Sequence, residues 1–342
     1  MENLETTLYG NRWKPLIILT VIVLALPFFV HAPHLFTLLI LIGLYAIATI
    51  GLSLLIGYAG QVSLGHAAFF GIGAYVSGML TTKLTLSPWL AMGIGIILTF
   101  FIAYVIGIPI LKLKGHFLAL ATLGFNIIVN VLIVGLDDYT GGPLGLNGIP
   151  ELNLLGLDLG NPLYFYYFTW LVVGIIILFS TNIVRSHVGR LLRSIHDSEI
   201  ATQTLGVNVA KYKVAIFAIS AAYASLAGSL YAHFINFIAP PTFNISLSIL
   251  LLIMVMIGGS YSLYGAILGT AIILFLQEGI RFVGHNYLHI SGPVEIVVYG
   301  FMIIVVMMFA PKGFISIGSG LYHQFSAGKS KELAEAKGVL NE

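Results

Sequence analysis

Charged residues are so scarce in this 342-residue chain that five uncharged stretches, among them residues 15–82 and 214–277, are longer than a membrane-spanning helix. Lysine, arginine, aspartate and glutamate make up 8% of the residues, and 58% of the residues are hydrophobic. A soluble domain carries about 25% charged residues, and a helix needs about 20 apolar residues to cross a bilayer. The sequence therefore excludes a soluble globular protein and predicts an all-α polytopic membrane protein.

Ten apolar segments, separated by turns or charges, are candidate transmembrane helices. Ten spans of about 20 residues leave roughly 140 residues for all loops and tails, too few for a large soluble domain. The segments are residues 15–31, 35–57, 62–82, 89–111, 116–136, 163–184, 214–237, 246–258, 262–280 and 293–311. The eighth is too short to span unless it is tilted or broken. Residues 1–14 are read as a cytoplasmic N-terminus, 15–311 as the membrane domain, which begins with a retained first helix, and 312–342 as a cytoplasmic tail.

The distribution of basic residues predicts the orientation of the spans. With the N-terminus inside and ten alternating crossings, 13 of the 15 lysines and arginines fall inside, and only Lys83 and Arg281 fall outside. Basic residues concentrate in cytoplasmic loops of membrane proteins. Both termini are therefore expected in the cytoplasm.

Two loops are large enough for a role of their own, and their charges differ in sign. The predicted outer loop, residues 137–162, has four acids and no base, whereas the predicted inner loop, residues 184–213, has five bases against Asp197 and Glu199. The inner loop has two interpretations. It is either a topology anchor, since positive charge alone holds a loop inside, or a docking surface for a cytoplasmic partner.

The segment from Gly57 to Tyr75 contains glycines that weaken a helix by about 1 kcal/mol each relative to alanine. One interpretation is close helix packing through small residues. The other is a broken helix whose freed backbone, with Gln61, Ser63 and His66, lines a polar cavity, because irregular backbone survives at membrane depth only in such places. Both can hold in one segment.

A partial echo of this segment occurs at Gly259-Ser260-Tyr261-Ser262-Leu263, where Gly-x-x-Ser-Leu and the small-residue spacing recur. Duplication would explain the echo, and so would two helices that face one crowded bundle axis. Five residues do not decide between these explanations, so the echo serves only as a packing signal.

The fifth segment places Thr122, Asn126 and Asn130 four residues apart, and therefore on one helix face. Polar groups are costly in lipid, so this face is expected to point into the bundle. Hydrogen bonding between helices and a substrate pathway are the two interpretations.

Several classes of chemistry have no motif in the sequence. There is no Gly-x-x-x-x-Gly-Lys-Ser/Thr phosphate loop, no His-Glu-x-x-His, no Gly-x-Ser-x-Gly and no cysteine. No acid or base lies near the middle of a predicted span, which disfavours proton coupling. We expect no catalytic, metal or cofactor-binding residue, and a channel or an externally powered permease remains.

The outer loop contains a turn-rich run that begins at Thr140, Gly141 and Gly142 and ends at Pro150. Most such loops simply connect spans. The alternative is a role in receiving the substrate or a binding protein.

The run at residues 57–66, Gly-Tyr-Ala-Gly-Gln-Val-Ser-Leu-Gly-His, closely resembles the signature of permease subunits of branched-chain amino acid ABC importers, the LivM type. Further blocks similar to this family follow in family order at residues 115–125, 140–150 and 189–213. Together they cover most of residues 40–280.

This resemblance implies an importer of several subunits in the cell (inner or plasma) membrane. The chain would pair with a second, LivH-like permease, two cytoplasmic ATPases similar to LivG and LivF, and an extracytoplasmic amino-acid-binding protein, with no nucleic-acid partner. The partner ATPases would bind ATP and Mg, so this chain would need no cofactor. The missing phosphate loop agrees with energy that arrives from a partner.

The resemblance also implies that the basic inner loop is the coupling helix that seats in the ATPase. The matching positions are Arg190, Arg193, Asp197, Glu199 and Gly206. The loop departs from the Glu-Ala-Ala-x-x-x-Gly pattern of many importers, because its glutamate lies seven residues before the glycine instead of six.

Two further departures concern the candidate pathway. Ile127 stands where many family members carry glutamate, and Asn130 replaces a following basic residue. Any pathway role inferred there is weakened. The family also includes urea and short-chain amide permeases, which the general motifs do not separate. The predicted function is ATP-driven import of branched-chain or other apolar amino acids. The alternatives are a urea or amide ABC permease and a partner-independent channel for a small neutral solute.

Overall fold

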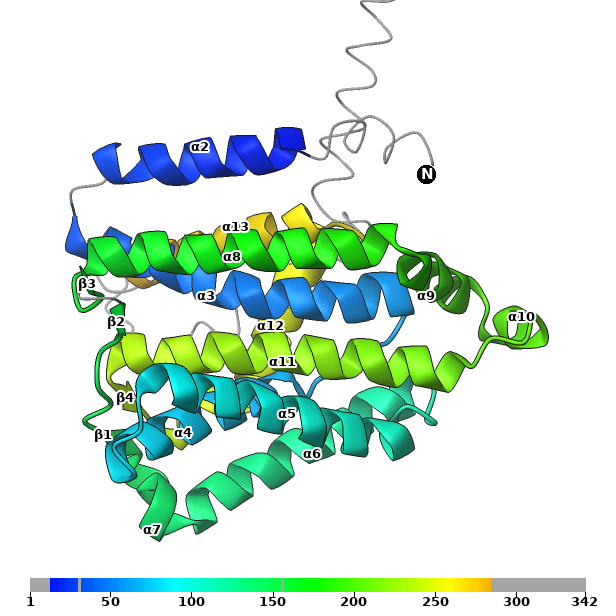
Figure 1. The fold of residues 1–342 in the computed structure, drawn as a ribbon, viewed down its shortest axis with the longest axis horizontal. Helices are drawn as coiled ribbons and strands as arrows, with labels where there is room; N and C mark the ends of the chain where they lie inside the picture. The colour runs from blue at the N-terminus through cyan, green and yellow to red at the C-terminus, as the bar shows by residue number, and fades with distance from the viewer. Residues whose placement is uncertain (1–12, 30–31, 155–156, 284–342) are drawn as a thin grey trace, which may run out of the picture.

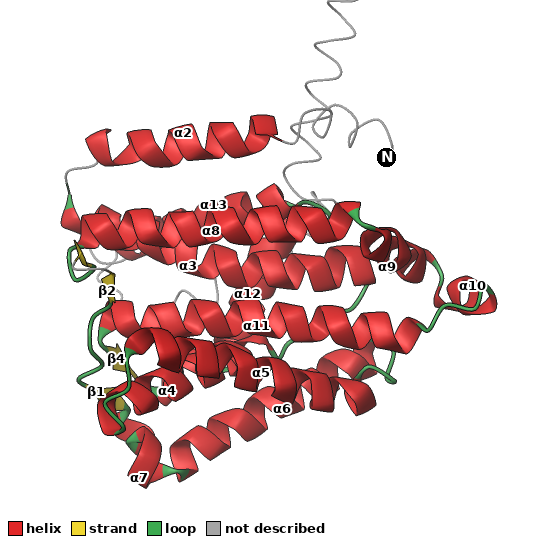
Figure 2. Cartoon of the chain, viewed as in Figure 1, coloured by secondary structure: helices red, strands yellow, loops and turns green. Residues whose placement is uncertain are grey.

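The computed structural model describes residues 13–29, 32–154 and 157–283, most of which lie in helices (Figures 1 and 2). The longer helices are α2 (Trp13–Phe29), α3 (Pro33–Ser53), α4 (His66–Lys83), α5 (Pro88–Ile110), α6 (His116–Gly135), α8 (Pro162–Arg185), α9 (His187–Asp197), α11 (Val209–Ile235), α12 (Ile245–Gly258) and α13 (Leu263–Val283). The shorter helical elements are the π-helical turn η1 (Leu54–Tyr58), α7 (Asp137–Thr140), η2 (Gly142–Leu144), α10 (Glu199–Thr204) and η3 (Pro240–Phe243). Strands β1 (Leu146–Asn147) and β4 (Phe237–Ile238) pair antiparallel, as do β2 (Asn153–Leu154) and β3 (Leu157–Asp158).

Side-chain caps fix where several helices begin. Ser87 before α5 and Asn161 before α8 each accept a hydrogen bond from a backbone amide in the first turn, and a proline follows each of them. The caps of α9, α10, α11 and α12 are Ser186, Ser198, Asn208 and Asn244. Because a free first-turn amide is satisfied this way, a cap stabilises a helix by about 1 kcal/mol.

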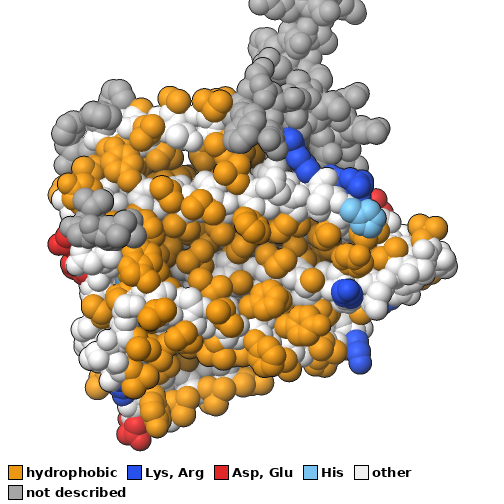
Figure 3. Space-filling model, viewed as in Figure 1, with side chains coloured by type: hydrophobic (Ala, Val, Ile, Leu, Met, Phe, Trp, Pro, Cys, Tyr) orange, Lys and Arg blue, Asp and Glu red, His pale blue; other side chains and the backbone are white. Residues whose placement is uncertain are grey.

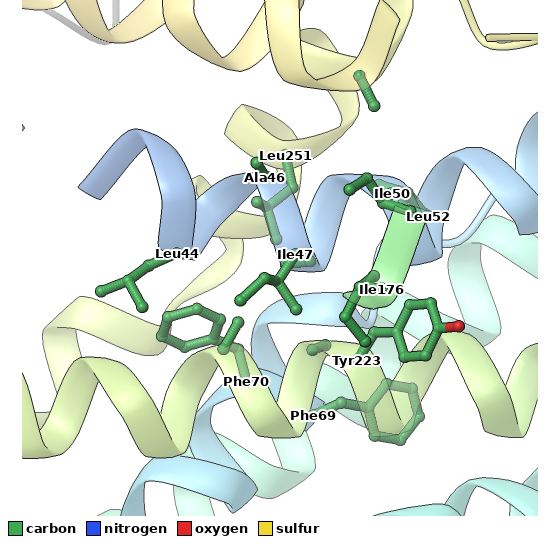
Figure 4. Close-up of a cluster of buried hydrophobic side chains, with 14 of the residues drawn as sticks. Leu44, Ala46, Ile47, Ile50, Leu52, Phe69, Phe70, Ile176, Tyr223 and Leu251 are labelled. Carbon is green, nitrogen blue, oxygen red and sulfur yellow. The ribbon is translucent and has the colours of Figure 1, made fainter. Parts of the chain in front are cut away.

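Two helices form the centre of the bundle, and others face outward. In the most apolar window of α3 with η1, 89% of the residues are buried, compared with 28% in α6. Leu44 and Ile47 of α3 lie in one buried cluster with Phe70 of α4 and Tyr223 of α11 (Figure 4). Apolar side chains also cover much of the outer surface, as lipid contact requires (Figure 3).

Helices α4 and α11 approach so closely that only small residues fit between them. A Cβ atom on Gly228 would lie 1.9 Å from the carbonyl oxygen of Phe70, and one on Gly73 would lie 2.1 Å from that of Ser225. A Cβ on Gly71 would be 3.1 Å from Phe243. The interpretation of the glycines in α4 as close-packing residues is therefore confirmed.

Nine of the ten predicted apolar segments coincide with helices. The tenth, residues 293–311, lies outside the described residues, as do residues 1–12 and the predicted tail 312–342. Among the described residues, six helices are long and apolar enough to cross a membrane: α3 with η1, α5, α6, α8, α11 and α13. The short eighth segment forms α12, whose 14 residues extend about 21 Å. The total of ten spans and the cytoplasmic termini stay predictions.

Two predicted boundaries were wrong. The third helix begins at His66 instead of residue 62, because residues 60–65 follow an irregular path. The seventh begins at Val209 instead of residue 214, because the Asn208 cap starts it earlier, and Lys213 lies buried in its second turn.

Apart from the segment between η1 and α4, most connections between helices gather at two opposite ends of the bundle (Figure 1). We call them the strand end, which carries α7 and the four strands, and the α9–α10 end. At the strand end, the Trp89 indole donates a 2.8 Å hydrogen bond to the Asn153 carbonyl, and Lys83 donates to the Asp138 carbonyl. At the α9–α10 end, Lys114 lies 3.7 Å from Glu199. These contacts agree with the predicted alternation of the loops.

Candidate functional site

The chain between η1 and α4 is irregular inside the bundle, as the broken-helix interpretation requires. Gly60 has a φ of 66°, a conformation that favours glycine. The amide of Leu64 donates a 3.0 Å hydrogen bond to Thr122 Oγ1 of α6. A Cβ on Gly65 would lie 3.0 Å from the Thr122 carbonyl oxygen, so the two backbones are in close contact. Close packing and a break in the helix thus both occur within residues 57–75, and the polar cavity that the second interpretation adds stays a prediction.

The first residue of α4, His66, marks the depth of this break. Its Nε2 lies 2.7 Å from Ser220 Oγ, and its Nδ1 lies 3.2 Å from Ser63 Oγ. Ser220 is about 17 Å along α11 from its first residue, at 1.5 Å per residue. Helix α4 therefore begins in the interior of the bundle. His66 is fully buried between two hydroxyls, the geometry of a hydrogen-bonded packing residue.

Ser248 of α12 joins the start of α4 to α6. Its Oγ accepts hydrogen bonds from the amide of Ala67 at 3.0 Å and from Asn126 Nδ2 at 3.1 Å. Asn126 Oδ1 and both polar atoms of the Gln61 side chain are buried without a hydrogen-bond partner among the described residues. Burying a polar group without a hydrogen-bond partner costs from about 1 to several kcal/mol. Gln61 and Asn126 are thus the candidate pathway residues with hydrogen-bonding capacity left over.

The three polar residues of α6 lie on one face of the helix, as the sequence predicts, and each makes a hydrogen bond from it. Thr122 accepts from Leu64, Asn126 donates to Ser248, and Asn130 Nδ2 donates a 3.1 Å hydrogen bond to the Pro240 carbonyl in η3. All three hydrogen bonds join α6 to other elements. This agrees with the first of the two interpretations, hydrogen bonding between helices. A role for Gln61, Ser63, His66, Thr122, Asn126 and Asn130 in a substrate pathway stays a prediction.

The outer-loop residues form a structured turn. Thr140 is buried and donates a 2.6 Å hydrogen bond to the Ile133 carbonyl. Gly141 and Gly142 have φ values of 77° and 56°, and a Cβ on Gly141 would lie 2.1 Å from the Gly145 carbonyl oxygen. These residues therefore close the turn between α7 and β1.

His233, near the end of α11, ties the outer loop to the bundle. Its Nδ1 lies 2.8 Å from the Pro150 carbonyl oxygen, and its Nε2 lies 2.8 Å from Ser77 Oγ of α4. Sequence reasoning missed His233, together with Ser220 and Ser248. Single serines and histidines in apolar helices show no spacing that would reveal their partners.

The α9–α10 end carries the predicted coupling residues. Glu199 accepts a hydrogen bond from buried Lys213 and lies 3.7 Å from Lys114. Gly206 has a φ of 82° in the turn after α10, and no atom lies within 4 Å of where its Cβ would be. Arg190 and Asp197 are exposed on α9. Glu199 is thus joined to helix α11, and Arg190 and Asp197 project outward.

Arg193, the remaining coupling candidate, lies partly buried on α9, one residue after buried Leu192. It therefore presents less of its surface than Arg190 does.

Helix α9 also touches the irregular segment. A Cβ on Gly60 would lie 2.8 Å from the His196 ring, and the Tyr261 hydroxyl lies 3.0 Å from His196 Nε2. The Tyr58 hydroxyl donates a 2.9 Å hydrogen bond to the Tyr261 carbonyl. Partial burial and the charge of nearby Asp197 raise the pKa of Tyr261, which keeps its hydroxyl protonated.

The echo segment, residues 259–263 after α12, packs against the start of the segment that it resembles, residues 57–75. A Cβ on Gly57 would lie 1.9 Å from the Ser260 carbonyl oxygen, and Ser53 Oγ donates a 2.8 Å hydrogen bond to the same oxygen. The two similar runs therefore pack directly against each other at the α9–α10 end, which confirms the echo as a packing signal.

The apolar helices, the irregular segment inside them and the uncharged polar cluster define a multi-pass membrane protein with a buried polar interior. Residues 34–307 match the family model described as branched-chain amino acid transport system / permease component. The chain belongs to this family and is a permease component of a branched-chain amino acid transport system.

Two of the similar proteins carry a branched-chain amino acid description, and a third is a ribose permease. The high-affinity branched-chain amino acid transport system permease protein LivM of Escherichia coli is 29% identical over 296 residues, covering 80% of this chain and 68% of the relative. The probable branched-chain amino acid transport permease protein LivM of Methanocaldococcus jannaschii is 23% identical over 316 residues, covering 80% and 90%. The ribose import permease protein RbsC of Haemophilus influenzae is 29% identical over 127 residues, covering 35% and 38%. No solved structure matches the chain.

Proposed function

We propose that this chain is one permease subunit of an ATP-binding cassette importer for branched-chain or other apolar amino acids. It forms the translocation pathway with a second, LivH-like permease in the inner or plasma membrane, and it faces the cytoplasm with its α9–α10 end. Two ATPases similar to LivG and LivF bind ATP and Mg there, and a binding protein delivers the amino acid at the strand end. The chain itself is not an enzyme.

The observation that carries this proposal is the contact between helix α9 and the irregular segment. Ring contacts of His196 with Gly60 and Tyr261 connect a surface that partners can reach to the start of the broken span. A displacement of α9 would therefore be transmitted to residues 60–65. This segment contains the buried amide of Gln61, and it bonds to α6, which carries the buried amide of Asn126. Coupling by this route requires no titratable group inside the membrane.

Reconstitution tests the proposal directly. The chain, a second permease, both ATPases and a binding protein are placed in vesicles, and ATP-dependent uptake of labelled leucine is measured. We expect uptake to require every component. Transport that persists undiminished without the ATPases would refute the proposal.

Two substitutions test the coupling surface. Glu199→Lys places a like charge beside Lys213 and Lys114, and Gly206→Pro fixes φ near −65° where the chain needs a positive value. Both variants are expected to hydrolyse ATP without uptake while they still reach the membrane. Glu278→Lys makes the same charge change at the far end of α13 and is the matched control. Wild-type uptake in both coupling variants would reject the role.

A urea or short-chain amide permease is the second candidate, since the leftover hydrogen-bonding groups of Gln61 and Asn126 are neutral amides. If the chain is such a permease, labelled urea is taken up in place of labelled leucine. Urea or the amide would then compete with leucine weakly or not at all. Flux of either solute without any partner would favour a channel.

A further inference from the structure

A basic pocket of about 440 Å³ lies at the α9–α10 end, apart from the polar cluster inside the bundle. The loop after α5 supplies Lys112 and Lys114, α10 supplies Glu199, and α11 supplies Lys211 and Lys213. Two sequence regions thus bring four lysines to one cavity, and a third brings Glu199.

Positive charge is in excess in this pocket. Glu199 is the single acid among the described residues that line it, so four lysines and one carboxylate leave a formal charge of +3. Lys213 is buried and donates to Glu199, whereas Lys112, Lys114 and Lys211 are exposed around it. An anionic group would offset part of this excess.

Apolar surface continues from the pocket along the outer face of the bundle. Tyr104 and Ile108 line the pocket on α5 and are 44% and 48% exposed. Leu113 in the loop after α5 and Phe117 in the first turn of α6 are also exposed. On the face in Figure 3, blue basic side chains lie beside orange apolar ones at this end. A ligand that fits both parts has an anionic head and an apolar tail.

We propose that the pocket binds the headgroup of an anionic phospholipid. The phosphate lies among Lys112, Lys114 and Lys211, and an acyl chain runs along Tyr104 and Ile108. Basic pockets between membrane helices bind anionic headgroups, and each lysine or arginine near the surface contributes about 1 kcal/mol. This site depends on the chain lying in a membrane and not on ATP-driven import, so the two proposals fail separately.

Native mass spectrometry of the full chain in detergent tests the site. Phosphatidylglycerol and phosphatidylcholine are titrated separately, and the bound lipid is counted. We expect one phosphatidylglycerol to bind more tightly than the rest, with no such site for phosphatidylcholine. The variant K112Q/K114Q/K211Q is expected to weaken it on the order of 100-fold, about five-fold for each lysine.

Lys83→Gln is the matched control, because it removes a lysine at the strand end. It is expected to leave the binding unchanged. If the triple variant does not fold, as judged by elution and thermal unfolding, the double variant K112Q/K211Q changes only two exposed side chains and is expected to lose about 25-fold. Equal phosphatidylglycerol binding by wild type and the folded variant overturns the proposal. Displacement by millimolar inorganic phosphate overturns the lipid assignment as well, since free phosphate would then be the ligand.

Discussion

Replacing Gly228 with alanine tests whether α4 and α11 are as close as the structure has them. The added Cβ would lie 1.9 Å from the carbonyl oxygen and 2.7 Å from the carbonyl carbon of Phe70. Ordinary van der Waals contact begins at 3.4 Å, so the helices would have to separate by about 1.5 Å, the difference between 3.4 and 1.9 Å. Both atoms belong to helix backbone, which cannot rotate away as a side chain can.

The magnitude follows from the cost of overpacking. Forcing an extra methyl group into a packed interior costs about 1 to 3 kcal/mol. Alanine favours a helix over glycine by up to about 1 kcal/mol, so a net loss reports the collision and not the intrinsic propensity. With about 2 to 4 °C for each kcal/mol, the unfolding midpoint is expected to fall on the order of 5 °C. Thermal unfolding of the full chain in detergent, followed by size-exclusion chromatography, measures it.

Gly174→Ala in α8 is the matched control. It is the same change in the interior of another long helix, and no atom lies within 4 Å of the added Cβ. Its midpoint is expected to stay unchanged or to rise slightly. If Gly228→Ala proves as stable as Gly174→Ala, the close approach of α4 and α11 is refuted.

Two further predictions concern hydrogen bonds around the irregular segment. Ser248→Ala leaves the Ala67 amide and Asn126 Nδ2 without their common acceptor, so the free energy of unfolding is expected to fall by about 1 to 3 kcal/mol; thermal unfolding measures it, and a stability equal to wild type would contradict the hydrogen bonds. Tyr261→Phe removes the hydroxyl beside His196 and is expected to lower leucine uptake per ATP hydrolysed in the reconstituted importer, with little change in midpoint; an unchanged ratio would argue against transmission through this contact.

The helices themselves were largely predictable, because hydropathy and charge spacing depend on local sequence. Residues 89–111 and 116–136 were expected as spans, and α5 and α6 cover residues 88–110 and 116–135. The start of α4 was not predictable to the residue. It is fixed by bonds to Thr122 and Ser220, which lie far along the chain, and apolar Val62 and Leu64 give no local sign of them.

The candidate site shows the same division. The common face of Thr122, Asn126 and Asn130 follows from helical periodicity alone and is confirmed. Their partners come from α12, η3 and the irregular segment, and a helix period carries no information about which element it meets. Glu199 could be singled out through family resemblance, whereas its contact with Lys213 needed the three-dimensional fold.

The close contact of α4 with α11 has a consequence for how the chain enters the membrane. Helix α4 is not among the described helices apolar enough to span by composition, whereas α3, just before it, has a mean hydropathy of 2.5. Gly73 lies against the Ser225 carbonyl and Ser77 bonds to the His233 side chain, and both of these residues belong to α11, which is synthesised after more than a hundred further residues. We therefore expect α3 to partition into lipid on its own during translation, and α4 to reach its final depth only after α11 has been synthesised.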